Sequence, residues 1–171
     1  GKDPSSDYTA GNITYDELGR PSYDLIVQGE VVNRISLGVT GEHNVYNSLS
    51  AIAVALELGV GFDGVIAGLR KFTGTDRRFE KKGEIGGVTV IDDYAHHPQE
   101  ISATLKAAEN YPHKRLWVVF QPHTYTRTKA FLDEFAQALS GADEVILADI
   151  FAARETDTLG VSSRDIACLL Y

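Results

Sequence analysis

Two stretches in the second half of the chain carry carboxylates, imidazoles and a guanidinium directly after short apolar segments. The first, Asp92–Pro98, reads Asp-Asp-Tyr-Ala-His-His-Pro, and the second, Gln121–Thr128, reads Gln-Pro-His-Thr-Tyr-Thr-Arg-Thr. A carboxylate or an imidazole at such a place can hydrogen-bond a ribose, coordinate a metal or carry a proton. In the second stretch, His123 and Arg127 are four positions apart and share one face if a helix begins near Pro122. Cations near a helix start favour binding of a carboxylate or a phosphate.

Both stretches also have a purely structural interpretation. In Asp92–Pro98 the carboxylates can sit at a helix start with the histidines at the surface, although the concentration of functional groups favours a site. In Gln121–Thr128 a site is again favoured, because cations near the N-terminus of a helix are unfavourable without an anion. A third polar stretch, Asp149–Glu155, follows residues 145–148 and is equally well explained by an internal salt bridge.

Two weaker signals lie nearer the N-terminus. Asn44 and Asn47 are three positions apart and lie on one face of a predicted helix. Their carboxamides can donate and accept hydrogen bonds, as reading the edge of a purine base requires. From spacing alone, capping of the helix by Asn44 is the favoured interpretation. The adjacent Arg77 and Arg78 can reach a phosphate, but most arginine pairs at a protein surface have no such role.

The predicted elements place these groups in an α/β protein. Short β segments are expected before about Thr40, followed by a helix over residues 48–59 that is buried on nearly all sides. Apolar strands at 88–91, 116–120 and 145–148 alternate with helical stretches. In an open parallel sheet the carboxyl ends of the strands meet at one edge, where ligands bind. The three polar stretches should therefore converge on one site.

Composition and charge exclude several classes of protein. The 171 residues carry a formal net charge of -8, and no basic stripe indicates a nucleic-acid binder. No apolar run approaches the roughly 20 residues of a membrane span, and the start of the chain lacks a secretory signal. The single cysteine, Cys168, has no partner for a disulfide or a zinc site. These features predict a soluble cytoplasmic protein without membrane or nucleic-acid partners.

Four motifs together resemble the Mur ligases, the ATP-dependent amino-acid ligases of peptidoglycan precursor synthesis. The segment Gly41–Ala51 resembles the His-Asn-x-x-Asn-x-x-Ala segment of that family. Residues 77–79 and the stretches Asp92–Pro98 and Gln121–Thr128 are similar to the members that join L-alanine to UDP-N-acetylmuramate. The resemblance covers essentially the whole chain.

The resemblance implies a C-terminal, Rossmann-like, mainly parallel sheet with flanking helices, preceded by the β/α tail of an ATPase domain. The tail would comprise residues 1–77 and the ligase domain residues 78–171. The resemblance also implies a fragment of a longer ligase, which on its own neither hydrolyses ATP nor ligates. In the intact enzyme ATP and Mg2+ would be used, with UDP-N-acetylmuramate and L-alanine as the substrates, and the magnesium carboxylate would lie upstream.

The resemblance further implies roles for the residues of the first motifs. Asn44 and Asn47 would contact adenine. Arg78 would reach the γ-phosphate of ATP. Asp92 or Asp93 would bind the ribose or orient the linker between the domains.

The remaining site residues would face the acyl phosphate and the carboxylate of alanine: Tyr94, His96, His123, Thr124 and Arg127. Among them, His96 and His123 would act in catalysis together with Arg78. Some relatives carry Arg where this chain has Thr124, so contacts with the alanine carboxylate would be made by Arg127. No metal ligand is expected within the chain.

Two alternatives stay open. One is another Mur-type ligase, such as the recycling enzyme that attaches a ready-made tripeptide to UDP-N-acetylmuramate, although the clusters at 94–97 and 123–127 argue against it. The other is a non-catalytic nucleotide-binding module. A substrate screen tests the first, and a heat-stability shift with ADP but none with alanine would favour the second.

Overall fold

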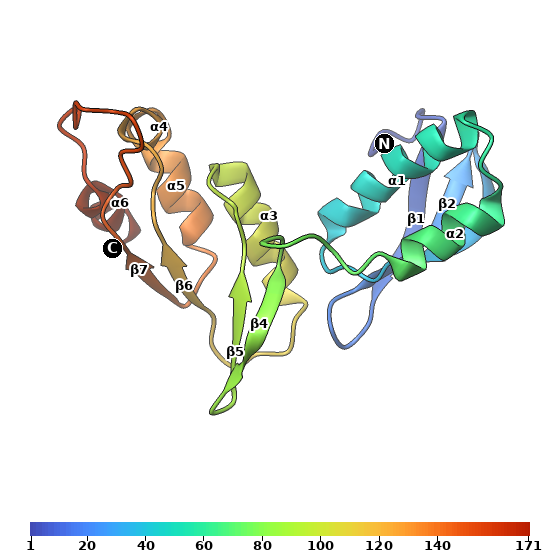
Figure 1. Cartoon of the computed structure of the whole chain (residues 1–171), viewed down its shortest axis with the longest axis horizontal. Coiled ribbons are helices and arrows are strands. Elements are labelled where there is room, and N and C mark those ends of the chain that lie inside the picture. Colours follow the sequence, from blue (N-terminus) through green and yellow to red (C-terminus); the bar gives the residue numbers. More distant parts are fainter. The chain divides into compact units, whose positions relative to one another are not determined.

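The structure is a computed structural model and describes residues 1–171. Contacts within it divide the chain into two compact units. The first unit comprises Gly1–Asp93 with Ala107–Pro112, and the second comprises Tyr94–Lys106 with His113–Tyr171. Each unit has its own hydrophobic core cluster. Figure 1 shows the helices and strands, coloured along the sequence. The domain boundary expected between residues 77 and 78 stays a prediction.

A three-stranded antiparallel sheet begins the first unit. Its strands β1 (Tyr8–Tyr15), β2 (Pro21–Val27) and β3 (Glu30–Ser36) lie in the order β1-β2-β3. Gln28 and Gly29 join β2 to β3 with φ angles of 51° and 86°, and such positive values are what a two-residue hairpin turn requires. The turn therefore helps to fix the register in which the two strands pair.

Two helices, α1 (Glu42–Glu57) and α2 (Phe62–Lys71), complete the core of this sheet. Side chains along β2 alternate between buried and partly exposed, because successive residues of a strand point to opposite faces. The buried members of the core are Tyr23, Leu25, Ile35 and Leu37 from β2, β3 and the residue after it, Val45, Leu49 and Ile52 from α1, and Val65 from α2. The expectation that α1 is buried on nearly all sides is wrong, because its residue Val54 is 60% exposed.

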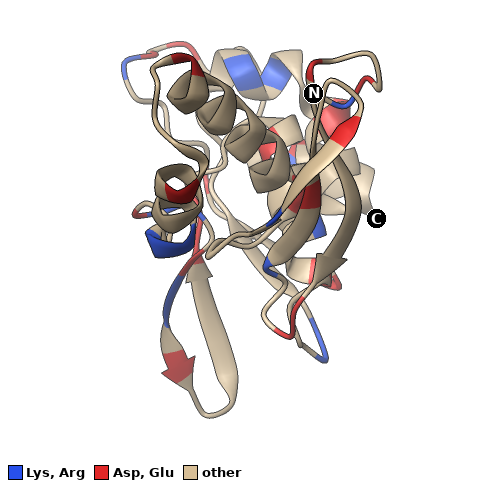
Figure 2. Ribbon diagram, turned by 90° about the vertical axis from the view of Figure 1, so that its right-hand side faces the viewer, with Lys and Arg blue, Asp and Glu red and all other residues tan.

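A β-hairpin of β4 (Glu80–Ile85) and β5 (Val88–Asp92) belongs to the same unit. Gly86 and Gly87 form its turn with φ angles of 59° and 80°. Charged side chains lie along β4, whereas β5 carries no charge before its last residue (Figure 2). The first carboxylates of the polar stretch therefore lie at the open end of the hairpin.

The second unit contains a parallel pair of strands, β6 (Trp117–Phe120) and β7 (Glu144–Leu147). The helices near them are α3 (Pro98–Glu109), α4 (Tyr125–Ala130), α5 (Leu132–Leu139) and α6 (Ser163–Leu170). The connection from β6 to β7 is helical, as parallel pairing favours, and the α/β class is confirmed. The strand β5, expected to belong to a parallel sheet, pairs antiparallel with β4. None of the helices has the length and apolar character needed to cross a membrane.

The core of the second unit lies among its helices and the end of β6. Ile101 and Leu105 of α3 are four positions apart on one helix face and are both buried. Phe135 of α5 is fully buried, and its ring centroid lies 5.4 Å from that of Phe120. This core fixes the end of β6, from which the second polar stretch extends.

Candidate active site

Aromatic rings from separate segments of the second unit lie in a row. The ring centroid of Tyr94 lies 5.3 Å from that of His96, and His96 lies 6.4 Å from His123. The ring of His123 stacks on that of Phe151 with a centroid distance of 5.5 Å and an interplanar angle of 16°. We call these four residues the ring row. Its members follow β5, β6 and β7 in the chain, so residues of all three polar stretches converge.

Arg127 joins the ring row through His123. Its Nη1 donates a hydrogen bond to the carbonyl oxygen of His123 at 2.7 Å and lies 3.4 Å from Nδ1 of the same residue. The contact spans four positions, although α4 begins only at Tyr125, so that His123 lies before the helix. An imidazole and a half-buried guanidinium thus lie together, which suits a carboxylate or a phosphate.

The chain supplies its own anion at the start of α4. One carboxylate oxygen of Glu155 accepts a hydrogen bond from the Thr124 hydroxyl at 2.5 Å, and the other accepts one from the backbone N–H of Thr126 at 3.0 Å. The hydrogen bond from the Thr124 side chain is the main cause that lowers the pKa of Glu155 to about 2. Because Glu155 already provides a negative charge, the cations at this helix start do not by themselves indicate a ligand anion.

Glu100 fixes the backbone of the two adjacent histidines. It is the third residue of α3, and its Oε2 accepts the backbone N–H of His96 at 3.0 Å and that of His97 at 3.2 Å. The imidazoles have different neighbours: His97 packs against Phe131 with a centroid distance of 4.8 Å, and His96 Nδ1 lies 2.9 Å from the carbonyl oxygen of Tyr94. His96 therefore belongs to the ring row, and His97 packs beside it.

The two asparagines of the first unit contact each other. Asn47 Nδ2 donates to Asn44 Oδ1 at 3.1 Å, and Asn44 Nδ2 donates to the carbonyl oxygen of Thr40 at 2.8 Å. The N-cap of α1 is Gly41 and carries no side-chain capping bond, so the interpretation of Asn44 as the helix cap is wrong. Both carboxamides lie in the first turns of α1.

The neighbouring carboxylates Asp92 and Asp93 have different partners. Asp92 lies near two cations, with its Oδ2 3.5 Å from Arg77 Nε and 3.9 Å from Lys82 Nζ. Asp93 Oδ2 accepts the backbone N–H of Phe79 at 2.8 Å. Asp93 thus holds the backbone of the segment before β4, while Asp92 balances charged side chains around it.

Arg78 lies between two residues with left-handed backbone. Arg77 and Phe79 have φ angles of 58° and 50°, which residues other than glycine rarely adopt. Carboxylates hold both of them, because the N–H of Arg77 donates to Glu80 Oε2 at 2.7 Å and that of Phe79 donates to Asp93. The Arg78 side chain is exposed.

The charges of Asp93 and Arg78 affect the pKa of His43. Although the residue keeps contact with solvent, partial burial of its imidazole lowers its pKa. The carboxylate of Asp93 opposes this shift, and the guanidinium of Arg78 reinforces it. The three side chains are therefore close enough to interact electrostatically. No feature of the sequence around His43 indicates this proximity, because it depends on tertiary structure.

Glu100 and Phe151 are the site residues that the sequence interpretation misses. Glu100 has a recognisable signal, because a glutamate at the third position of a helix that opens with Pro98 can accept the N–H groups before it. No pattern in the sequence around Phe151 indicates that it belongs to the site. Its place depends on an isolated parallel bridge with His123, beyond the ends of β6 and β7.

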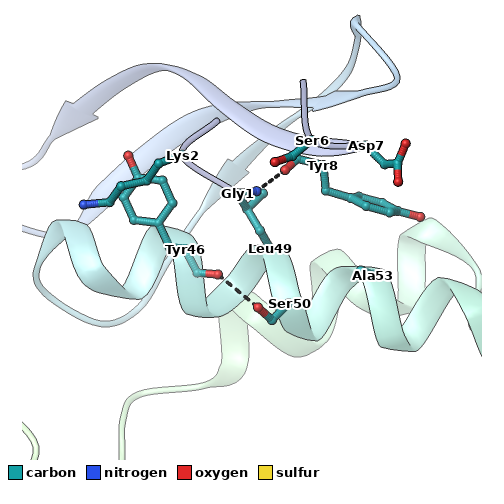
Figure 3. Close-up of a pocket in the computed structure, with 9 residues that line it drawn as sticks. All are labelled: Gly1, Lys2, Ser6, Asp7, Tyr8, Tyr46, Leu49, Ser50 and Ala53. Carbon is teal, nitrogen blue, oxygen red and sulfur yellow. Dashed lines mark hydrogen bonds between the residues drawn. The ribbon is translucent and has the colours of Figure 1, made fainter. Parts of the chain in front are cut away.

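A pocket of the first unit contains none of the predicted site residues. It lies between the start of the chain and α1, and its wall includes Lys2, Tyr8, Tyr46 and Ser50 (Figure 3). The Lys2 ammonium lies 4.8 Å from the centroid of the Tyr46 ring, and the Ser50 hydroxyl donates to the Tyr46 carbonyl oxygen at 3.5 Å. The terminal amine of Gly1 donates to the Tyr8 carbonyl oxygen. These polar groups bind one another, so we assign no ligand to this pocket.

Comparison with known proteins finds relatives along the chain. The family model described as "Mur ligase, glutamate ligase domain" matches residues 77–170. A UDP-N-acetylmuramate–L-alanine ligase from Lachnospira eligens is 63% identical over 167 residues, which are 97% of this chain and 36% of that protein. The chain therefore spans about 36% of the length of this relative.

Solved structures agree with these sequence relatives. The crystal structure of a UDP-N-acetylmuramate–alanine ligase from Thermotoga maritima matches with a TM-score of 0.75 and 32% identity, over 87% of this chain and 33% of that one. A murein peptide ligase from Psychrobacter arcticus matches with a TM-score of 0.58 and 31% identity, over 84% of this chain and 30% of that one. Both matches cover most of this chain and about a third of the other.

Proposed function

Because the chain belongs to the Mur ligase family, we propose that the protein is an ATP-dependent ligase that joins L-alanine to UDP-N-acetylmuramate in peptidoglycan precursor synthesis. The observation that carries the proposal is the contact of the Tyr94, His96 and His123 rings, with Arg127 bound to His123. The names of the relatives at 63% and 32% identity support the choice of substrates.

The proposed reaction has two chemical steps. A carboxylate oxygen of UDP-N-acetylmuramate attacks the γ-phosphorus of ATP, and ADP leaves, so that an acyl phosphate forms. The neutral amine of L-alanine then attacks the acyl carbon, loses a proton, and inorganic phosphate leaves with the electrons of the broken C–O bond. Negative charge develops on oxygen in both steps, so fixed cations and N–H donors lower both barriers.

The amino acid would be bound by the second polar stretch and the ring row. Arg127 would bind the carboxylate of alanine, because a guanidinium can donate two parallel hydrogen bonds to it. The imidazoles of His96 and His123 would accept the proton of the amine, since imidazole is the side chain suited to proton transfer near neutral pH. Tyr94 and Thr124 would line the place of the amino acid.

The nucleotide would be bound by residues of the first unit. Asn44 and Asn47 would contact adenine through their carboxamides. Arg78 would reach the γ-phosphate, and its exposed guanidinium leaves it available for this contact. Asp92 or Asp93 would bind the ribose or orient the linker, and the bond from Phe79 N–H to Asp93 supports the second role for Asp93.

Mg2+ belongs to the proposal only as a companion of ATP. No group of three or more His, Cys, Asp and Glu side chains within residues 1–171 is placed to hold a metal ion. Neither step above is assigned to the ion. We place the reaction in the cytoplasm, because ATP and a nucleotide-linked sugar are its substrates.

Substitution of Arg127 by alanine in the full-length ligase tests the proposed function. Losing the charged partner of the alanine carboxylate should weaken the use of L-alanine by roughly 2–4 kcal/mol, with the KM for ATP unchanged. Arg164→Ala, an exposed position on α6, is the matched control and should change neither value. Steady-state kinetics at varied alanine concentration measures the effect. An unchanged KM for alanine in Arg127→Ala would remove this residue from the site.

A second candidate is the attachment of a ready-made peptide to the same sugar nucleotide. The 31% identity with a murein peptide ligase favours it, although the relative named for L-alanine shares 63% identity. Turnover of L-alanine, L-serine, glycine and a tripeptide by the full-length protein separates the two candidates. Preferred turnover of the tripeptide would replace the function proposed above.

A further inference from the structure

The segment Phe151–Glu155 contacts the start of the loop Gln121–Arg127. The backbone N–H of Phe151 donates to the carbonyl oxygen of Pro122 at 2.8 Å, and its ring stacks on the imidazole of His123. Just before this segment, the carbonyl oxygen of Asp149 accepts a hydrogen bond from Gln121 Nε2 at 3.2 Å. A backbone bond, a side-chain bond and a ring stack thus act on consecutive residues of the loop.

The same segment contacts the other end of the loop through Glu155. Its two carboxylate oxygens each take one donor, the hydroxyl of Thr124 and the backbone N–H of Thr126. An ionised carboxylate accepts only, and no neutral side chain of this length offers two equivalent acceptor atoms to two donors. Glu155 therefore restrains the loop immediately before Arg127.

We propose that Phe151 and Glu155 are positioning residues for the amino-acid substrate. Phe151 sets the plane of the His123 imidazole, and Glu155 fixes the first turn of α4, from which Arg127 reaches back to His123. This inference rests on the proposed function, because it assigns the loop to the binding of L-alanine.

The exposure of Phe151 supports a role at the site. Its side chain is 54% exposed, so burial in the core does not explain its position. The stack with His123 and the backbone bond to Pro122 are the contacts that define where it lies. The ring of Phe151 covers one face of the His123 imidazole. It does not cover the side that faces His96.

The contact between Arg127 and His123 explains why positioning matters here. Arg127 Nη1 bonds the His123 carbonyl oxygen, so a change at either end of the loop alters the distance between guanidinium and imidazole. Binding groups that act on one small substrate need a fixed geometry, and displacements of about 1 Å can cost on the order of a hundredfold in rate.

Two variants test the inference. Glu155→Gln removes the negative charge and leaves one acceptor oxygen where the carboxylate has two, and Phe151→Leu removes the ring but keeps an apolar side chain. Glu134→Gln, an exposed position on α5, is the matched control for the loss of one charge. In NMR spectra of the chain, Glu155→Gln should shift the amide signals of residues 124–127, and Phe151→Leu should shift the ring signals of His123. Glu134→Gln should shift neither set.

Kinetics of the full-length ligase provide the second measurement. Both variants should raise the KM for L-alanine on the order of tenfold and leave the KM for ATP unchanged. Unshifted loop signals, or an unchanged KM for alanine in an enzyme that uses alanine, would overturn the inference and leave the proposed function intact. If the wild-type protein does not use alanine, the proposed function fails, and the positioning of a substrate by these residues fails with it.

Discussion

The candidate site residues of the two units differ in the contacts that they make. In the second unit, the members of the ring row contact one another although they come from distant parts of the sequence. In the first unit, Asp92 and Asp93 bind cations and backbone of their own chain, and the side chain of Arg78 is exposed. Loops at the ends of strands are thus brought together by the fold, whereas the charges around residues 77–80 first stabilise the backbone of that segment.

The reason for the difference lies in what precedes each group. His123 and Phe151 follow a pair of parallel strands, so the ladder itself brings them together. Arg78 follows no strand, and its neighbours Arg77 and Phe79 adopt a left-handed backbone that needs support. Asp93 and Glu80 supply this support through hydrogen bonds to the backbone, so both carboxylates have a structural role.

The largest expected effect concerns the core of the second unit. Phe135 is 0% exposed, so Phe135→Ala should lower the free energy of unfolding of the second unit by about 3–5 kcal/mol. NMR signals of the ring row should then lose dispersion at a lower urea concentration than those of Tyr23 in the first core. Val119→Ala, at a position 74% exposed, is the control and should have little effect. Simultaneous loss of both sets of signals would show that the two units unfold together.

A smaller effect should distinguish the two adjacent carboxylates of the first unit. Asp93→Asn weakens the charged hydrogen bond from Phe79 N–H and should cost about 1–2 kcal/mol. Asp92→Asn loses only partly exposed ion pairs and should cost less than about 1 kcal/mol. Urea denaturation at low and high salt measures both values, and salt should reduce the cost of Asp92→Asn more strongly. Equal costs would mean that the two carboxylates play the same structural role.

The smallest expected effect is a pH dependence of stability. Glu155 should cause it, and it should appear in the second unit only. The pKa of Glu155 is lowered from 4.5 to about 2 by its hydrogen bonds, so the folded state favours the ionised form. This contribution to stability is present above pH 4.5 and is lost as the pH falls from 4.5 to about 2. Thermal denaturation of the wild type and of Glu155→Gln should therefore differ above pH 5 and become alike near pH 2. A difference that persists at pH 2 would assign the effect to packing.

Local features of the structure could be predicted from the sequence because short-range rules determine them. Gly86 and Gly87 indicate the hairpin turn, and the structure places strands over most of the three apolar segments. His123 and Arg127 are four positions apart, and they contact each other although His123 lies outside α4.

Contacts between distant segments could not be predicted in the same way. Thr124 and Glu155 are 31 positions apart, and nothing in either stretch indicates that a hydroxyl of one meets a carboxylate of the other. The exposed side of α1 was likewise missed, because an alanine-rich apolar helix looks the same in sequence whether or not a partner covers it.

The isolated bridge between His123 and Phe151 also constrains which changes in chain length the protein tolerates. An insertion between Leu147 and Phe151 would shift the bridge by one residue and turn the aromatic ring to the opposite side. The turn at Leu159 and Gly160 lies outside this constraint, so natural variants should differ in length there and keep a constant spacing between Leu147 and Phe151.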